Sequence, residues 1–157
     1  MSEATALPFA DKGIRLSIVR PSRFVHGTDC NTGFISQMID IAKQTGKSAY
    51  IESGKNRTQA VHHLDLAKLY RLAIEKGKGI YNGVAEGEVD FISIATLIGK
   101  KLSLSVESLP LDNGFAHFGF MGRMLAIDNP ATSTKTQQEL GWTCTQNTLA
   151  QDLQDKA

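Results

Sequence analysis

The chain has 157 residues, of which 41% are hydrophobic and 21% are charged, and its formal net charge is +1. This length and apolar content suit one globular domain over residues 1–157. The near-neutral charge argues against a nucleic-acid or anionic-membrane surface, and no apolar run of the sequence approaches the roughly 18 residues that span a bilayer. We therefore expect neither nucleic acid nor a membrane among its partners.

The two cysteines, Cys30 and Cys144, are too few for a disulfide framework. They predict free thiols in a reducing compartment. The first residues also lack the charged and apolar regions of a secretory signal. Together these features favour a cytoplasmic location.

The first elements expected in chain order are a helix and a strand. Apolar positions predict a helix over residues 2–12, which Pro8 should kink or shorten and which Gly13 can cap. Residues 14–20 carry branched aliphatic side chains at alternate positions, which is typical of a strand. This segment has the pattern of a central strand covered on both faces.

Helical and strand patterns alternate through the rest of the chain. Asp90 is the expected N-cap of its helix, whereas residues 114–127 are aromatic and have no clear period. Four strands and about six helices place the chain in the α/β or α+β class with a small sheet. The remaining helices are expected over residues 34–42, 64–76, 91–98, 132–140 and 148–153, and the remaining strands over 48–51, 80–85 and 102–109.

The sequence lacks two motifs that nucleotide-dependent oxidoreductases use. A glycine-rich turn that binds a pyrophosphate follows a strand and opens a helix, but Gly77–Asn82 follows a helix and enters a strand. A tyrosine general acid needs a lysine four residues later, which lowers the pKa of the phenol. That position holds Gly54 after Tyr50, Ile74 after Tyr70 and Ala85 after Tyr81. No catalytic residue is predicted.

The histidines allow two interpretations. His62, His63 and Asp65 could form a histidine–carboxylate pair, or they could be a polar loop that enters a helix with Asp65 near its start. No pair of histidines or cysteines has the spacing of metal ligands, so no metal site is predicted. Phenylalanine and methionine side chains between residues 115 and 124 could line an apolar ligand pocket, but we expect a core or an interface.

Four segments together resemble one enzyme family. They are residues 13–27 with Arg20-Pro21, residues 57–67 with Val61-His62, residues 80–83, and the closing stretch 128–142. This set is similar to the C-terminal half of the extended and atypical short-chain dehydrogenase/reductases, the NAD(P)-dependent epimerase/dehydratase-like family. The resemblance covers almost the whole chain. It implies an α/β, partial Rossmann-like fold, with one central strand plus the C-terminal α/β substrate lobe and its small sheet.

The resemblance also implies site residues. In this family the loop after the sixth strand contacts the nicotinamide end of NAD or NADP, which implies Pro21, Ser22 and Val25 as cofactor-binding positions. The arginine of the second segment commonly meets the substrate, which implies Arg57. His26 is the second substrate-binding candidate. Tyrosine is usual at the position of His26, so the chain looks like an atypical branch whose small-molecule substrate is open.

The glycine-rich loop and the Tyr-Lys pair of the family would precede Met1. The resemblance therefore implies a substrate-side fragment of an NAD(P)-dependent oxidoreductase or epimerase, which is inactive alone and does not bind the cofactor by itself. The alternatives are a non-enzymatic small-molecule sensor or protein-interaction module, and a split enzyme completed by a second polypeptide.

A strand that lacks its neighbours exposes apolar side chains. Each aliphatic side chain left in water forgoes about 1.5 to 3 kcal/mol of burial, and an open strand edge is a template for association. We therefore expect a homo-oligomer that pairs through residues 14–20 or through residues 115–124.

Overall fold

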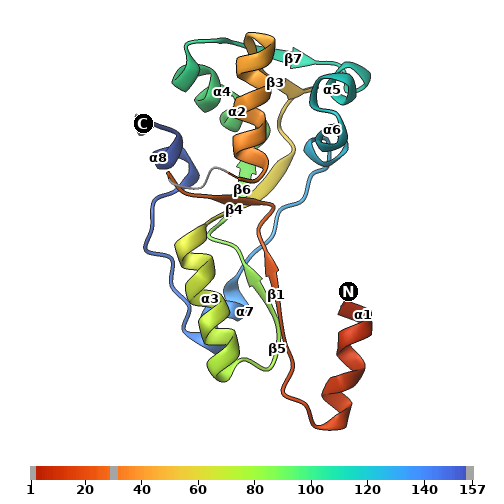
Figure 1. Cartoon of the computed structure of the whole chain (residues 1–157), viewed down its shortest axis with the longest axis vertical. Helices are drawn as coiled ribbons and strands as arrows, with labels where there is room; N and C mark the ends of the chain where they lie inside the picture. Colours follow the sequence, from red (N-terminus) through yellow and green to blue (C-terminus); the bar gives the residue numbers. More distant parts are fainter. Residues whose placement is uncertain (1–2, 29–31, 155–157) are drawn as a thin grey trace.

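The computed structural model describes residues 3–28 and 32–154 and has an α/β fold (Figure 1). No helix within these residues is both long and apolar enough to cross a bilayer. The helices are α1 (Glu3–Ala6), the 3-10 helix η1 (Leu7–Lys12), α2 (Phe34–Thr45), α3 (His63–Lys76), α4 (Phe91–Leu102), α5 (Leu111–Phe118), α6 (Phe120–Leu125), α7 (Thr134–Leu140) and α8 (Leu149–Gln154). The strands are β1 (Ser17–Pro21), β2 (Phe24–His26), β3 (Lys47–Ile51), β4 (Arg57–His62), β5 (Gly79–Gly83), β6 (Glu86–Asp90) and β7 (Ser105–Leu109).

The strands form three small sheets. β1 pairs in parallel with β5, and β3 pairs in parallel with β7. The third sheet has the order β2–β4–β6, in which β2 is parallel and β6 antiparallel to β4. Parallel pairs need a crossover connection, and helices stand between the paired strands along the chain. The α/β class expected from the sequence is therefore confirmed.

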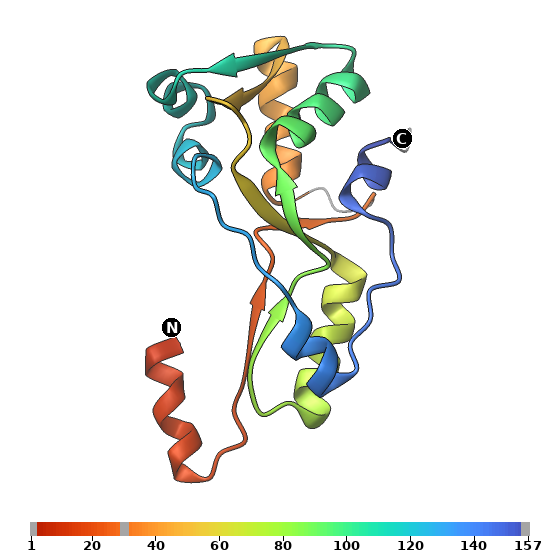
Figure 2. The same ribbon diagram turned by 180° about the vertical axis from the view of Figure 1, so that it is seen from behind.

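The β2–β4–β6 sheet lies between two groups of elements (Figures 1 and 2). On one side, α3 and α7 lie beside the β1–β5 pair. On the other side, α2, α4, α5 and α6 surround the β3–β7 pair. α8 packs on α4 and also reaches β4, so the last helix returns to the middle of the molecule.

Each group has its own apolar core. In the larger core, the ring of Phe24 meets those of Phe34 and Phe91 edge to face, with centroids 6.0 and 5.8 Å apart. The smaller core lies under α3, and Trp142 at 1% exposure is its largest side chain. Its buried members are Val61, Leu66, Leu69, Tyr81, Leu140 and Trp142.

Several helix ends lie where the sequence predicts them. Asp90 accepts a hydrogen bond from the Ser93 amide at 2.8 Å and is the N-cap of α4. Gly13 ends η1 in the left-handed conformation, with φ at 80°, which glycine adopts without strain. Pro8 lies in η1, and the chain changes there from α-helix to 3-10 helix, as the missing amide of proline leads one to expect.

Three strands are present that the sequence pattern does not predict. β2 has only three residues, and β4 and β6 carry polar side chains that hide the strand period. The interpretation of the residues before His63 as a polar loop is wrong, because Arg57–His62 is a strand with five buried residues. Residues 114–127 are also more regular than expected, since most of them belong to α5 and α6.

β1 is more exposed than its sequence suggests. Its residues are half-buried or exposed, and Ile14, just before it, is 52% exposed. Within the described residues β1 pairs along one edge only, with β5. On its other side α1 stands apart from the sheet (Figure 2), and Arg20 reaches Glu3 of that helix through an ion pair. The strand therefore lacks the cover expected on both faces.

Candidate functional site

The loop after β1 is held by hydrogen bonds to β5. Ser22 is 4% exposed, and its amide and its hydroxyl both donate to the Gly83 carbonyl, at 3.0 and 2.8 Å. Pro21 precedes it at the exposed end of β1 and is the register partner of Gly83. Val25 is half-buried in β2 and packs against the smaller core. The three predicted cofactor-binding residues thus lie close together along the chain, and Pro21 is the exposed one among them.

Arg57 begins β4 and lies at the surface between two carboxylates. Its guanidinium donates to Asp128 through Nε and Nη2, at 3.1 and 2.9 Å, and to Glu88 through Nη1, at 3.1 Å. The hydrogen bond with Asp128 raises the pKa of Arg57 and holds the pKa of Asp128 below its usual range. An anionic ligand that binds Arg57 must therefore compete with these two carboxylates.

Arg57 and His26 belong to opposite ends of the same sheet. The register pairs His26 with His62, the last residue of β4, whereas Arg57 is the first. Five strand steps of roughly 3.3 Å separate the two ends by about 16 Å. The structure does not bring the two substrate-binding candidates together, so a ligand would have to span that distance to reach both.

His26 lies in a buried cluster of histidines and carboxylates next to α8. Its residue is 3% exposed, and its Nδ1 lies 2.6 Å from Oδ2 of Asp152. The Nε2 of His62 lies 3.8 Å from the same oxygen. The His26 and His62 rings meet edge to face at 5.5 Å, and His62 stacks on His63 at 4.6 Å. His26 is thus covered by protein, and its role toward a substrate stays a prediction.

The buried histidines contact Asp152, whereas Asp65 has another role. Asp65 lies in the first turn of α3, as expected, and is 1% exposed. Its carboxylate accepts hydrogen bonds from the Thr145 and Gln146 amides and from Lys68, each at 3.0 Å. Burial acts to raise the pKa of Asp65, but these hydrogen bonds outweigh burial and lower it. Asp65 therefore ties the segment that precedes α8 to the start of α3.

Asp152 and Glu86 are the members of the cluster that sequence reasoning missed. Glu86 accepts a hydrogen bond from the Leu149 amide at 2.8 Å, and its Oε1 lies 3.7 Å from Nε2 of His26. Asp152 is 126 residues from His26, and no spacing rule connects them. The one feature of the sequence that pointed to this cluster was the histidine at position 26, where tyrosine is usual in the family that the sequence resembles.

The remaining candidate groups show no reactive arrangement. Cys144 is a free cysteine, as predicted, whereas Cys30 lies outside the described residues. Although the residue is exposed, partial desolvation of the Cys144 sulfur, with Asp65 nearby, raises its pKa to about 11, so the thiol is protonated at neutral pH and is a poor nucleophile. Across residues 3–28 and 32–154, no three histidine, cysteine or carboxylate side chains are placed to hold a metal ion.

Comparison with curated proteins finds uncharacterised relatives of greater length. No family model matches the sequence. The chain is 43% identical over 159 residues to the uncharacterized protein C2A9.02 of Schizosaccharomyces pombe, and 41% identical over 155 residues to the uncharacterized protein YLL056C of Saccharomyces cerevisiae. These matches cover 100% and 98% of this chain but 54% and 52% of the relatives. The chain thus spans about half the length of the curated relatives it matches.

Solved structures show the same partial coverage. A dTDP-glucose 4,6-dehydratase from Bacillus anthracis in complex with NAD superposes with a TM-score of 0.71 at 18% identity, over 97% of this chain and 47% of the enzyme. A UDP-N-acetylglucosamine 4-epimerase from Methanobrevibacter ruminantium superposes with a TM-score of 0.71 at 14% identity, over 96% of this chain and 48% of the epimerase. A human epimerase family protein with NADPH superposes with a TM-score of 0.69 at 23% identity, over 88% of this chain and 47% of that protein. The chain has the fold of part of an epimerase/dehydratase-type enzyme. At these identities the likeness establishes the partial Rossmann-like fold alone.

Proposed function

We propose that this chain forms the substrate-side half of an NAD(P)-dependent oxidoreductase or epimerase of the short-chain dehydrogenase/reductase type. The observation that carries the proposal is the coverage: the fold matches nearly all of this chain and about half of enzymes whose structures hold NAD or NADPH. The curated relatives extend beyond the chain by a similar share.

In this proposal the chain alone neither holds the dinucleotide nor supplies the catalytic acid. A pyrophosphate binds where a strand turns into the N-terminus of a helix. Gly77–Asn82 instead leads from α3 into β5, which is the reverse order. None of the three tyrosines has a lysine four residues later. A complementary segment therefore supplies both parts.

The proposed roles of the site residues follow from their exposure. Pro21, Ser22 and Val25 shape the loop that meets the nicotinamide end of the cofactor, and Pro21, the last residue of β1, is the exposed member of the three. Arg57 is the exposed cation for the substrate. His26 is buried, so its proposed role on the substrate side is a positioning one: its contact with Asp152 holds β2 to α8.

Complementation in trans tests the proposal. The part of the S. pombe relative that this chain does not cover would be produced separately, and NADPH and NADH binding to it would be measured by fluorescence with and without the 157-residue chain. We expect the chain to tighten binding at least tenfold. The substitution Pro21→Asp should weaken this effect, whereas Pro130→Asp, at an exposed proline outside the loop, should not. Equal binding with and without the chain would contradict the proposal.

We also propose that the chain alone self-associates. Ile14 is 52% exposed beside the open edge of β1, and Phe120 in the second candidate segment is 80% exposed. A second copy would cover either surface. Sedimentation velocity at micromolar concentration should show a dimer or larger species. Ile14→Ser and Phe120→Ser distinguish the two surfaces, and a stable wild-type monomer would contradict self-association.

A further inference from the structure

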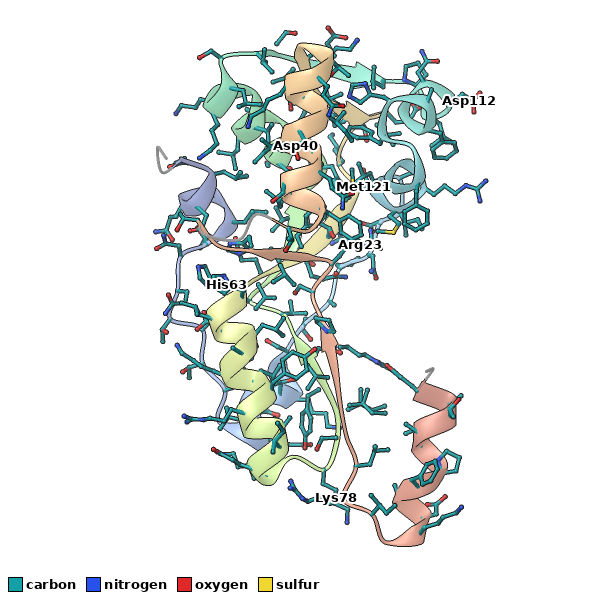
Figure 3. The ribbon with its side chains drawn as sticks, viewed as in Figure 1. Arg23, Asp40, His63, Lys78, Asp112 and Met121 are labelled. Carbon is teal, nitrogen blue, oxygen red and sulfur yellow. The ribbon has the colours of Figure 1, made fainter. Side chains whose placement is uncertain are left out.

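Arg23 carries a half-buried positive charge that no carboxylate of the described residues neutralises. It follows Ser22 in the loop after β1, and Figure 3 shows it at the start of β2, on the side of the sheet where α6 and Met121 lie. Its Nη1 donates a hydrogen bond to the Met124 carbonyl of α6 at 2.6 Å. The arginines that form ion pairs within residues 3–28 and 32–154 are Arg20, Arg57 and Arg71.

The charge of Arg23 is unbalanced in a place where water solvates it only partly. A charge that is taken out of water without a counter-ion costs free energy, so arginines away from the surface usually have a carboxylate partner. Burial lowers the pKa of Arg23, and no charged neighbour in the described part of the chain offsets this effect. The guanidinium nevertheless stays protonated, because arginine does not lose its proton in proteins. A negatively charged ligand would restore the balance.

Two of the three guanidinium nitrogens of Arg23 are open to such a ligand. Nη1 donates to the Met124 carbonyl, whereas Nε and Nη2 have no hydrogen-bond partner among residues 3–28 and 32–154. Neither atom is one of the buried side-chain atoms that lack a partner, so both reach the surface. Neighbouring guanidinium N–H groups bind a carboxylate or a phosphate through two parallel hydrogen bonds. The Nε–Nη2 edge of Arg23 is therefore free for this kind of contact.

The chain holds Arg23 in place from both sides. The amide and the hydroxyl of Ser22 both donate to the Gly83 carbonyl, which fixes the backbone before Arg23. Phe24, the next residue, is 0% exposed in the larger core. The Met124 carbonyl holds the guanidinium itself. An oxyanion thus meets donors that are already ordered, which lowers the entropic cost of binding.

Arg57 offers no such edge. Its Nε and Nη2 both donate to Asp128, and its Nη1 donates to Glu88, so all three nitrogens have a carboxylate partner. An oxyanion at Arg57 must displace one of these carboxylates. At Arg23 an oxyanion gains a partner without breaking an ion pair. The geometry therefore favours Arg23 over Arg57 as the oxyanion site.

We propose that Arg23 binds an oxyanion, a carboxylate or phosphate group of a small molecule, through its Nε–Nη2 edge. Arg23 directly follows Pro21 and Ser22, which the proposed function places at the nicotinamide end of the cofactor. In that enzyme the oxyanion belongs to the substrate, and Arg23 is a cation for it in addition to Arg57. The assignment to a substrate rests on the proposed function, whereas binding of an oxyanion by the chain does not.

Titration of the 157-residue chain, followed by NMR of the arginine side chains, tests the site. The ¹⁵Nε–¹H signal of Arg23, assigned as the one that Arg23→Lys removes, would be recorded with sodium acetate and with inorganic phosphate, while sodium chloride keeps the ionic strength constant. We expect a saturable shift, with a dissociation constant on the order of 1 to 10 mM for so small a ligand. The probe that binds more tightly identifies the preferred group. The absence of a saturable shift with both probes would overturn the proposal.

Matched variants separate a binding site from an arginine that only caps α6. Arg23→Lys keeps the charge but loses the flat pair of donors, so the affinity, followed at the Phe24 amide, should fall by about tenfold or more. Arg123→Gln removes an exposed arginine of α6 and should leave the affinity unchanged. Equal losses in the two variants would overturn the proposal. Should Arg23→Lys not fold, the wild-type titration and Arg123→Gln still decide.

The titration and the complementation experiment fail independently. A saturable shift at Arg23 together with failed complementation would support the oxyanion site and contradict the proposed enzyme. Successful complementation without a shift at Arg23 would overturn the oxyanion site alone.

Discussion

Replacement of Asp65 by alanine should destabilise the chain strongly. The carboxylate is 1% exposed and accepts the amides of Thr145 and Gln146 and the ammonium of Lys68. Alanine leaves the two amides without their acceptor, and a buried unsatisfied donor costs about 1 to 3 kcal/mol. Because Thr145 and Gln146 lie near the surface, where water can reach them, we expect a total loss of about 2 to 4 kcal/mol. That is a large share of a typical domain stability of about 5 to 15 kcal/mol.

Urea denaturation followed by the fluorescence of Trp142, the one tryptophan of the chain, measures this loss. Asp65→Asn keeps one acceptor oxygen and should fall between the wild type and alanine. Asp128→Ala is the matched control, since it removes an exposed carboxylate that pairs with Arg57 and should cost much less stability than Asp65→Ala. The reasoning is refuted if Asp65→Ala lies within about 0.5 kcal/mol of the wild type.

The pH dependence gives a second check on Asp65. Its pKa is lowered in the folded state, so its stabilisation is present above the ordinary value of 3.8 and is lost as the pH falls toward the folded value. The difference in unfolding free energy between wild type and Asp65→Ala should therefore be constant from pH 7 to about pH 5 and shrink below about pH 4. A difference that shrinks already between pH 7 and pH 5 would contradict this assignment.

Two further substitutions and one labelling experiment test other contacts of the structure. Trp142→Phe keeps the apolar bulk but removes the indole hydrogen bond to the Asp65 carbonyl at 2.8 Å, and calorimetry should show a loss of about 1 to 2 kcal/mol. Gly27→Ala would place a methyl group 2.2 Å from Nδ1 of His63 at a positive φ, so its melting temperature should fall well below that of Gly13→Ala, whose methyl group meets open space; equal melting temperatures would contradict the contact. In a Cys30→Ser background, iodoacetamide should label Cys144 slowly at pH 8 and faster only toward pH 11, and rapid labelling at pH 8 would argue against the raised pKa of this thiol.

Sequence patterns predicted the elements with strong helical periods and left out the strands with polar residues. α2, α3 and α4 were predicted because their buried residues recur at helical spacing, and Asp90 marks the start of α4. β4 was not, because both of its faces are covered and its sequence Arg-Thr-Gln-Ala-Val-His does not alternate. A strand buried on both faces has no period of two.

The candidate site was less accessible to sequence reasoning than the fold. Local chemistry predicted Asp65 at the start of a helix, since a carboxylate there is favoured by the exposed amides. The contact of His26 with Asp152 depends on how the chain returns to β2 after 126 residues, and no local pattern records that path. Arg57 and His62 likewise lie at opposite ends of β4. This separation depends on residues 57–62 forming a strand, which the sequence pattern did not predict.

The central claim, that this chain carries the substrate side without a dinucleotide site of its own, is tested most directly by calorimetric titration. The 157-residue chain would be titrated with NAD⁺, NADH, NADP⁺ and NADPH, with the full-length S. pombe relative as the comparison. We predict no saturable heat for the chain up to millimolar dinucleotide. Saturable one-to-one binding at micromolar concentration by the chain alone would contradict the account.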